Sequence, residues 1–159
     1  MKQRNSSSAY IKALDLLARR SYSKLKLNNK LQEKGFDPVE IKDAIEKLEE
    51  LNYIKEDYYK RSKIINLMRK GHSVKFIKYF LKREDQIETQ SSDILDIFGE
   101  FDLTEEDLIK KLIEKKLTEE VKKNHDKIKA KNKILRFLQN KGHDWATSSF
   151  LVEESLKVT

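Results

Sequence analysis

Two stretches of this chain share one pattern: SKLKLNNKLQEKGF at residues 23–36 and AKNKILRFLQNKGH at residues 130–143. In each, three residues spaced four apart lead into a Lys-Gly pair, and this spacing places all three on one side of a helix. Ser73, Ile77 and Leu81 repeat the spacing without the closing glycine. A unit that recurs at about 50 residues has room for about three helices. The sequence therefore predicts an all-α chain of three tandem three-helix repeats.

Stacked repeats bury the apolar stripes that each repeat cannot bury alone. We expect a flexible segment at residues 1–8 and repeats at residues 9–55, 56–103 and 104–159. An elongated array of this kind offers long binding surfaces rather than enclosed pockets. The residues expected to form the repeat-packing core are Leu14, Leu17, Leu27, Leu31, Ile45, Leu48, Ile77, Leu81, Ile134 and Leu138.

Composition supports helices and excludes several kinds of site. The chain has 159 residues, of which 38% are hydrophobic and 38% charged, with only four glycines and one proline. A β protein needs more turn residues than that. The absence of cysteine excludes disulfides and thiolate zinc sites and fits a reducing cytoplasm. No apolar run approaches the roughly 20 residues that span a bilayer, and the N-terminus lacks a signal-peptide core, so we expect no membrane association.

Local signals place the helix boundaries. Asp37-Pro38-Val39-Glu40 combines a capping residue, a proline suited to the first helical position and a capping-box glutamate. Gly35 suits a left-handed position that ends a helix. Ser73 is expected to cap a helix that runs to about Arg83, and Thr104 to open a later one. Thr118-Glu119-Glu120 indicates a further start, or one long charged helix to Lys141.

The charges are sorted by sign along the chain. Between Tyr58 and Arg83 there are nine basic residues and no acidic one, and between Glu84 and Leu108 there are ten acidic residues and no basic one. A basic ridge with an aromatic beside it suits contacts with phosphates, and Tyr79 lies beside such a ridge. The candidate residues for contact with a nucleic acid or its protein filament are Arg69, Lys70, Lys75, Lys78, Lys82 and Arg83.

Three alternatives remain open for these charges. The basic face can be merely solvated, Tyr79 can be an aromatic at the edge of the core, and the two blocks can pair with each other. Nothing in the sequence indicates catalysis, since it has no glycine-rich phosphate loop and no histidine pair at metal-binding spacing. His72 and His143 each follow a turn glycine and are expected to be exposed. We therefore expect no enzyme, no cofactor and no metal.

Three segments resemble the RecX family, the regulators of the recombinase RecA. The opening segment runs from Ala13 through Arg20 to Phe36, the second from Ile41 through Tyr59, and the third from Lys133 to Gly142. The chain departs from the family pattern at several positions, which makes it a divergent member. The departures are Lys26, Lys55, Glu56, Lys60, His143 and the missing Lys-Gly turn near Arg83.

The resemblance implies a curved array that binds along the groove of the RecA filament on single-stranded DNA. Such a regulator most often inhibits the ATPase and strand-exchange activities, within DNA repair, recombination and the SOS response. We expect a cytoplasmic monomer and leave open whether it also contacts DNA directly. The runner-up is a stand-alone DNA-binding protein, since three-helix units can resemble helix-turn-helix domains. A third alternative is a scaffold for another protein.

Overall fold

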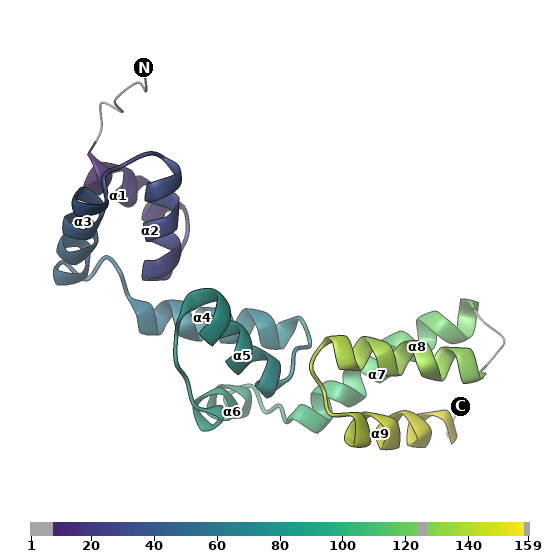
Figure 1. Ribbon diagram of the computed structural model, residues 1–159. Coiled ribbons are helices and arrows are strands. Elements are labelled where there is room, and N and C mark those ends of the chain that lie inside the picture. Colours follow the sequence, from purple (N-terminus) through teal and green to yellow (C-terminus); the bar gives the residue numbers. More distant parts are fainter. Residues whose placement is uncertain (1–7, 124–126, 158–159) are drawn as a thin grey trace. The chain divides into compact units, whose positions relative to one another are not determined.

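The structure is a computed structural model that describes residues 8–123 and 127–157. Among these residues every regular element is an α-helix, which confirms the predicted all-α class (Figure 1). The helices are α1 (Ala9–Arg19), α2 (Lys24–Glu33), α3 (Pro38–Glu50), α4 (Glu56–Arg69), α5 (Val74–Asp85), α6 (Ser91–Gly99), α7 (Glu105–Lys123), α8 (Lys127–Asn140) and α9 (Trp145–Lys157).

The chain divides into two compact units. The first unit comprises Met1–Ser62 together with Arg83–Ile87, and the second comprises Lys63–Lys82 together with Glu88–Thr159. The division falls inside α4 and α5 rather than between helices. Three tandem repeats in a curved array therefore stay a prediction, and each unit is described by itself.

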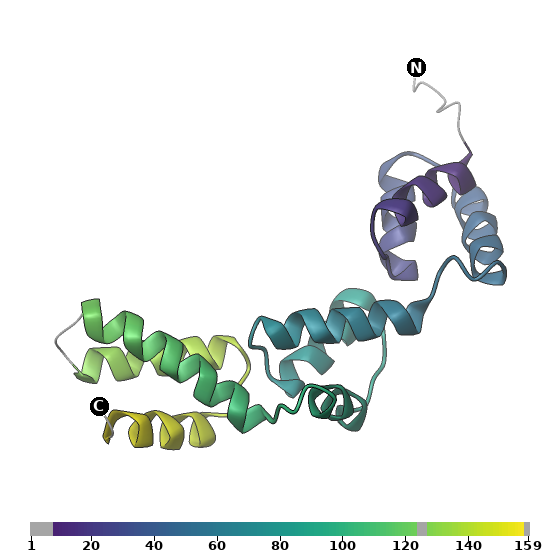
Figure 2. The ribbon, with the colours of Figure 1, turned by 180° about the vertical axis from the view of Figure 1, so that it is seen from behind.

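The first unit is built on α1, α2 and α3, which pack together in both ribbon views (Figures 1 and 2). Each helix begins at a serine or aspartate side chain that caps it, and the cap at Asp37 confirms the prediction. Ser8 accepts from the Ile11 amide, Ser23 from the Lys26 amide, and Asp37 from the Val39 amide. The buried cluster is Ala9, Ala13, Leu16, Tyr22, Leu27, Leu31, Ile41, Ala44, Ile45, Leu48 and Ile54.

The buried side of α1 is centred on Ala9, Ala13 and Leu16 rather than on the predicted Leu14 and Leu17. Leu14 and Leu17 are only partly buried and pack against the edge of the cluster, whereas Ala13 and Leu16 lie inside it. The two small residues Ala9 and Ala13 are fully buried. A helix that presents alanines can approach its neighbour more closely, so the leucines beside them are left at the margin of the contact.

The second unit contains a bundle of α7, α8 and α9, visible from both sides (Figures 1 and 2). Its buried cluster is Ile109, Ile113, Leu117, Ile134, Leu135, Leu138, Leu151 and Val152. The helix start predicted at Thr118 is wrong, because α7 runs through this residue to Lys123. The long helix predicted from there to Lys141 crosses residues 124–126, which lie outside the described part.

The turns that follow α2, α5 and α8 each contain a residue with a left-handed backbone conformation, but the residue type differs. Gly35 has a φ of 84° and Gly142 a φ of 86°. Glycine adopts this conformation without steric strain, so the predicted ending at Gly35 is confirmed. After α5 the positive φ of 54° falls on Gln86. Asp85 stands before it and is buried.

Candidate nucleic-acid interface

Helix α5 carries the central part of the predicted contact surface. Ser73 caps it, since its Oγ accepts from the Phe76 amide at 3.1 Å and its carbonyl accepts from the Ile77 amide at 3.0 Å. Ile77 and Leu81 are fully buried. This apolar side fixes the rotation of the helix and thereby decides which residues face solvent.

The opposite side of α5 is basic. Lys75, Lys78 and Lys82 recur at helical spacing and form what we call the α5 cationic face. Lys75 and Lys82 are exposed, Lys78 is half-buried, and Tyr79 beside them is 56% exposed. The Lys82 ammonium lies 2.9 Å from the Glu88 carboxylate. Within residues 8–123 and 127–157 we find no ion pair to Lys75 or Lys78.

The other three predicted contact residues, Arg69, Lys70 and Arg83, lie outside the α5 cationic face. The Arg69 guanidinium lies over the Phe101 ring, 5.8 Å from its centre, and Lys70 is exposed at the end of α4. Arg83 follows Lys82 on α5 but belongs to the first unit, and its Nε lies 3.7 Å from the Glu84 carboxylate. The six predicted residues therefore do not form one patch within a single unit.

Part of the acidic block serves helix starts. The Asp93 carboxylate accepts from the Gln90 amide and completes a capping box on α6. At the start of α7 the Thr104 amide donates to the Asp107 carboxylate, and the Asp107 amide donates to the Thr104 hydroxyl, which is again a capping box. Carboxylates at helix N-termini are also favoured by the helix dipole. Helix capping thus accounts for some of the acidic residues that follow the basic block. The pairs Lys82–Glu88 and Arg83–Glu84 join the two blocks, as expected under the alternative that the blocks pair with each other.

The expectation that His143 is exposed is wrong. Its side chain is 6% exposed, and its Nε2 lies 2.9 Å from the carbonyl oxygen of Gly71. Burial lowers the pKa of this imidazole, although the Gly71 carbonyl acts in the opposite direction. His72 is half-buried and stacks on Phe76, with ring centres 4.0 Å apart. The reason is tertiary, because the turn at Gly142 packs against Ser73 and Phe76.

Sequence reasoning missed a buried polar cluster in the first unit. The Tyr59 hydroxyl donates to Asp85 Oδ1 at 3.0 Å, and the Lys26 ammonium lies 2.5 Å from the same oxygen. Burial and the Asp85 charge raise the pKa of Tyr59. Burial opposes the Lys26 ammonium, yet hydrogen bonds to Asp85 and Tyr59 raise its pKa. Two departures from the family pattern marked this position in the sequence: Lys26 itself and the missing glycine after α5.

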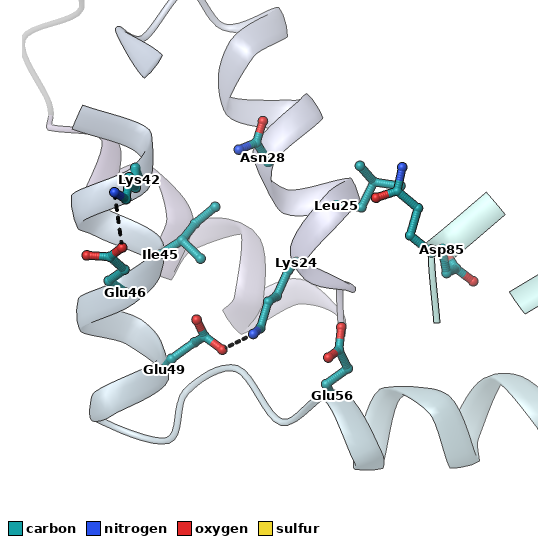
Figure 3. A pocket seen from close by; sticks show the side chains of 10 residues that line it. Lys24, Leu25, Asn28, Lys42, Ile45, Glu46, Glu49, Glu56 and Asp85 are labelled. Carbon is teal, nitrogen blue, oxygen red and sulfur yellow. Dashed lines mark ion pairs between the residues drawn. The ribbon is translucent and has the colours of Figure 1, made fainter. Parts of the chain in front are cut away.

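A second surface of the first unit is the pocket in Figure 3. It lies between α2 and α3 and receives side chains from both. Lys24 pairs with Glu49 across the pocket, and Lys42 lies 3.7 Å from Glu46. These pairs neutralise four of its charged side chains, and the carboxylates of Glu56 and Asp85 also line it. The described residues contain no group of three or more histidine, cysteine or carboxylate side chains that could hold a metal ion.

No helix within the described residues is long and apolar enough to cross a membrane.

The fold is similar to that of solved protein structures. The chain is similar to a crystal structure of RecX from Lactobacillus salivarius, with a TM-score of 0.65 and 22% identity over 92% of this chain and 93% of that one. A second crystal structure, of regulatory protein RecX, has a TM-score of 0.67 and 21% identity, and covers 91% of this chain and 70% of that one.

The sequence is similar to proteins named regulatory protein RecX. Residues 9–48 match the family model described as RecX, first three-helix domain. The Haemophilus influenzae protein is 31% identical over 79% of this chain and 82% of its own length. The Chlorobaculum tepidum protein is 30% identical over 99% of this chain and 92% of its own length. The Clostridium perfringens protein is 39% identical over 79% of this chain, but this match spans only 58% of that longer relative.

Proposed function

This chain belongs to the RecX family, and from that membership we propose that it regulates the recombinase RecA. The regulation we propose is inhibitory. The chain binds the RecA filament on single-stranded DNA and lowers its recombinase, strand-exchange and ATPase activities. It acts as a cytoplasmic monomer and needs no cofactor.

The observation that carries the proposed mode of binding is the α5 cationic face. Its lysines stand on the side of the helix that faces solvent, because Ile77 and Leu81 occupy the buried side. Lysine near a phosphate backbone displaces condensed counterions, and this release favours association at moderate salt. Lys75 and Lys78 are better placed for this role than Lys82, which Glu88 already neutralises in part.

A double charge reversal tests this assignment. We expect Lys75→Glu with Lys78→Glu to weaken binding to RecA-coated single strands by about tenfold or more, since two phosphate contacts become repulsive. The net charge falls from +7 to +3, because each reversal removes two positive charges. Binding is measured by fluorescence anisotropy of labelled filaments at fixed salt.

The matched control reverses the same number of charges on another helix. Lys111 and Lys115 are exposed on α7, so Lys111→Glu with Lys115→Glu gives the same net charge. Equal losses for the two double variants would show that only net charge matters and would remove the assignment to α5. Unchanged binding of the α5 variant would remove it as well.

Salt titration separates the filament from free DNA. A protein that binds duplex DNA directly loses affinity with a log–log slope of about −0.9 for each phosphate it neutralises. A filament regulator should bind RecA-coated single strands more tightly than bare DNA at the same salt. Tighter binding to bare DNA would instead favour the stand-alone DNA-binding protein.

A further inference from the structure

A small pocket in the first unit is walled by aromatic side chains. It lies where the segment between α1 and α2 meets the segment between α3 and α4, and it has a volume of about 200 Å³. That is below the range of roughly 300–1,000 Å³ typical of sites for drug-sized ligands. The space therefore suits a single ring. Its lining residues are Leu17, Ser21, Tyr22, Tyr53, Ile54, Lys55 and Tyr58.

Two of the tyrosines expose their rings to solvent. Tyr53 is 57% exposed and Tyr58 is 62% exposed, whereas Tyr22 is only 8% exposed and forms the floor. Exposed aromatic rings beside a pocket leave apolar area in water that a stacked ligand would cover. Neither ring belongs to a buried cluster of the first unit, so packing of the core does not explain them.

The backbone fixes the positions from which these rings project. Tyr53 follows Asn52, which has a φ of 57°, and its amide donates to the Leu48 carbonyl at 2.8 Å. The carbonyl of Lys55 accepts from the Tyr59 amide at 3.0 Å, so Lys55 stands at the start of α4 and Tyr58 lies in its first turn. A pocket built on a helix end and a helix start is largely preformed, which lowers the entropy lost on binding.

The charges around the pocket favour an anionic partner. Lys55 lines it, and the Arg20 guanidinium lies over the Tyr22 ring, 4.6 Å from its centre. None of the residues that line it within the described part of the chain is acidic. The nearby carboxylate of Asp57 lies 3.5 Å from the Lys60 ammonium. The site thus combines stacking surfaces with cations.

From these features we propose that this tyrosine pocket binds one base of a single-stranded nucleic acid. The base stacks on Tyr53 and Tyr58, and the flanking phosphates meet Lys55 and Arg20. Stacking of bases on aromatic side chains within a basic surface is how many proteins hold single strands without reading their sequence. The inference adds a contact to the proposed function but does not depend on RecA.

The test uses the full chain and a labelled oligothymidine of 15 nucleotides, without RecA. We expect Tyr53→Leu with Tyr58→Leu to weaken binding by about tenfold or more, as expected for the loss of base stacking. Tyr53→Phe with Tyr58→Phe should bind within about twofold of the parent, because the rings remain. Both positions are exposed, so neither substitution disturbs the core.

An abasic oligonucleotide of the same length separates stacking from charge. The parent should bind it about tenfold more weakly than oligothymidine, and the leucine variant should not distinguish the two. Phe150→Leu, which removes an exposed aromatic ring on α9, is the matched control and should retain the preference. Equal binding of both oligonucleotides by the parent would overturn the proposal. So would a leucine variant that loses RecA binding but keeps its affinity for oligothymidine, since that result would identify a protein-docking surface.

Discussion

Two turns of this molecule have nearly the same backbone conformation, but one is open to space and the other is closely packed. Gly35 and Gly142 each follow a lysine at the end of a helix, with φ values of 84° and 86°. A Cβ added at Gly35 would meet nothing within 4 Å, whereas one added at Gly142 would lie 2.6 Å from the Phe76 Cβ and 2.7 Å from the Ser73 Oγ. The repeated motif therefore specifies the turn, but it does not specify what the turn contacts.

The Gly142 turn is tied to Ser73 by hydrogen bonds as well. The Ser73 Oγ donates to the Gly142 carbonyl at 2.8 Å, and the Ser73 amide donates to the Lys141 carbonyl at 3.0 Å. In the Gly35 turn, the Gly35 amide donates to the Gln32 carbonyl and the Phe36 amide donates to the Leu31 carbonyl, and both acceptors belong to α2. The Gly35 turn ends α2, whereas the Gly142 turn both ends α8 and joins it to the start of α5 within the second unit.

The largest expected difference between the turns comes from alanine. We predict that Gly142→Ala destabilises the second unit by about 3 kcal/mol, because a left-handed alanine is strained and its Cβ overlaps packed atoms. Gly35→Ala should cost the first unit only about 1 kcal/mol, because strain acts alone there. Hydrogen exchange of amides in α8 and α2 measures each unit separately. Equal effects at both sites would contradict the comparison.

The serines that begin α2 and α5 extend this contrast. Ser23 and Ser73 each accept a capping bond, from Lys26 and Phe76 respectively, but only Ser73 also donates to Gly142. We expect Ser23→Ala to cost about 1 kcal/mol and Ser73→Ala about 2 kcal/mol, since the latter also loses the partly buried hydrogen bond to Gly142. Thermal unfolding of both variants, compared with hydrogen exchange in α2 and α5, checks the ratio. A larger loss for Ser23→Ala would show that the junction contributes little.

The residues that follow the two glycines predict a difference in acid response. Burial lowers the pKa of His143, so the unfolded chain binds its proton more readily than the folded one. The free energy of unfolding that depends on the neutral imidazole is fully present above the unfolded pKa. It is lost progressively as pH falls from the unfolded pKa through the lower folded pKa, by at most about 1.4 kcal/mol per pH unit for one proton. Phe36 holds the corresponding place in the first unit and cannot titrate.

Hydrogen exchange in α8 between pH 7.5 and pH 5 tests this expectation. His143→Phe should remove part of the acid loss there, while exchange in α2 should keep the same pH dependence in parent and variant. His72 also has a pKa lowered by burial, so a second variant, His72→Phe, separates the two contributions. An unchanged acid response in α8 after His143→Phe would contradict the assignment.

Local features of this fold were predictable, and features that depend on remote contacts were not. The caps at Asp37 and Ser73 and the ending at Gly35 follow from residues within one turn of the helix. The burial of His143 depends on the Gly71 carbonyl, and the position of Asp85 depends on Lys26, which no local pattern indicates. The same holds for the interface. Helical spacing alone placed Lys75, Lys78 and Lys82 together, whereas the ring beneath Arg69 required the structure.

The central claim, that the α5 cationic face brings this chain to the RecA filament, is tested most directly by the ATPase of RecA on single-stranded DNA. Added in increasing amounts, the parent chain should lower the ATPase, and the Lys75→Glu, Lys78→Glu variant should need about ten times more protein for the same effect. The Lys111→Glu, Lys115→Glu variant should act like the parent. An ATPase rate that the parent chain leaves unchanged, or that all three proteins lower equally, would contradict the claim.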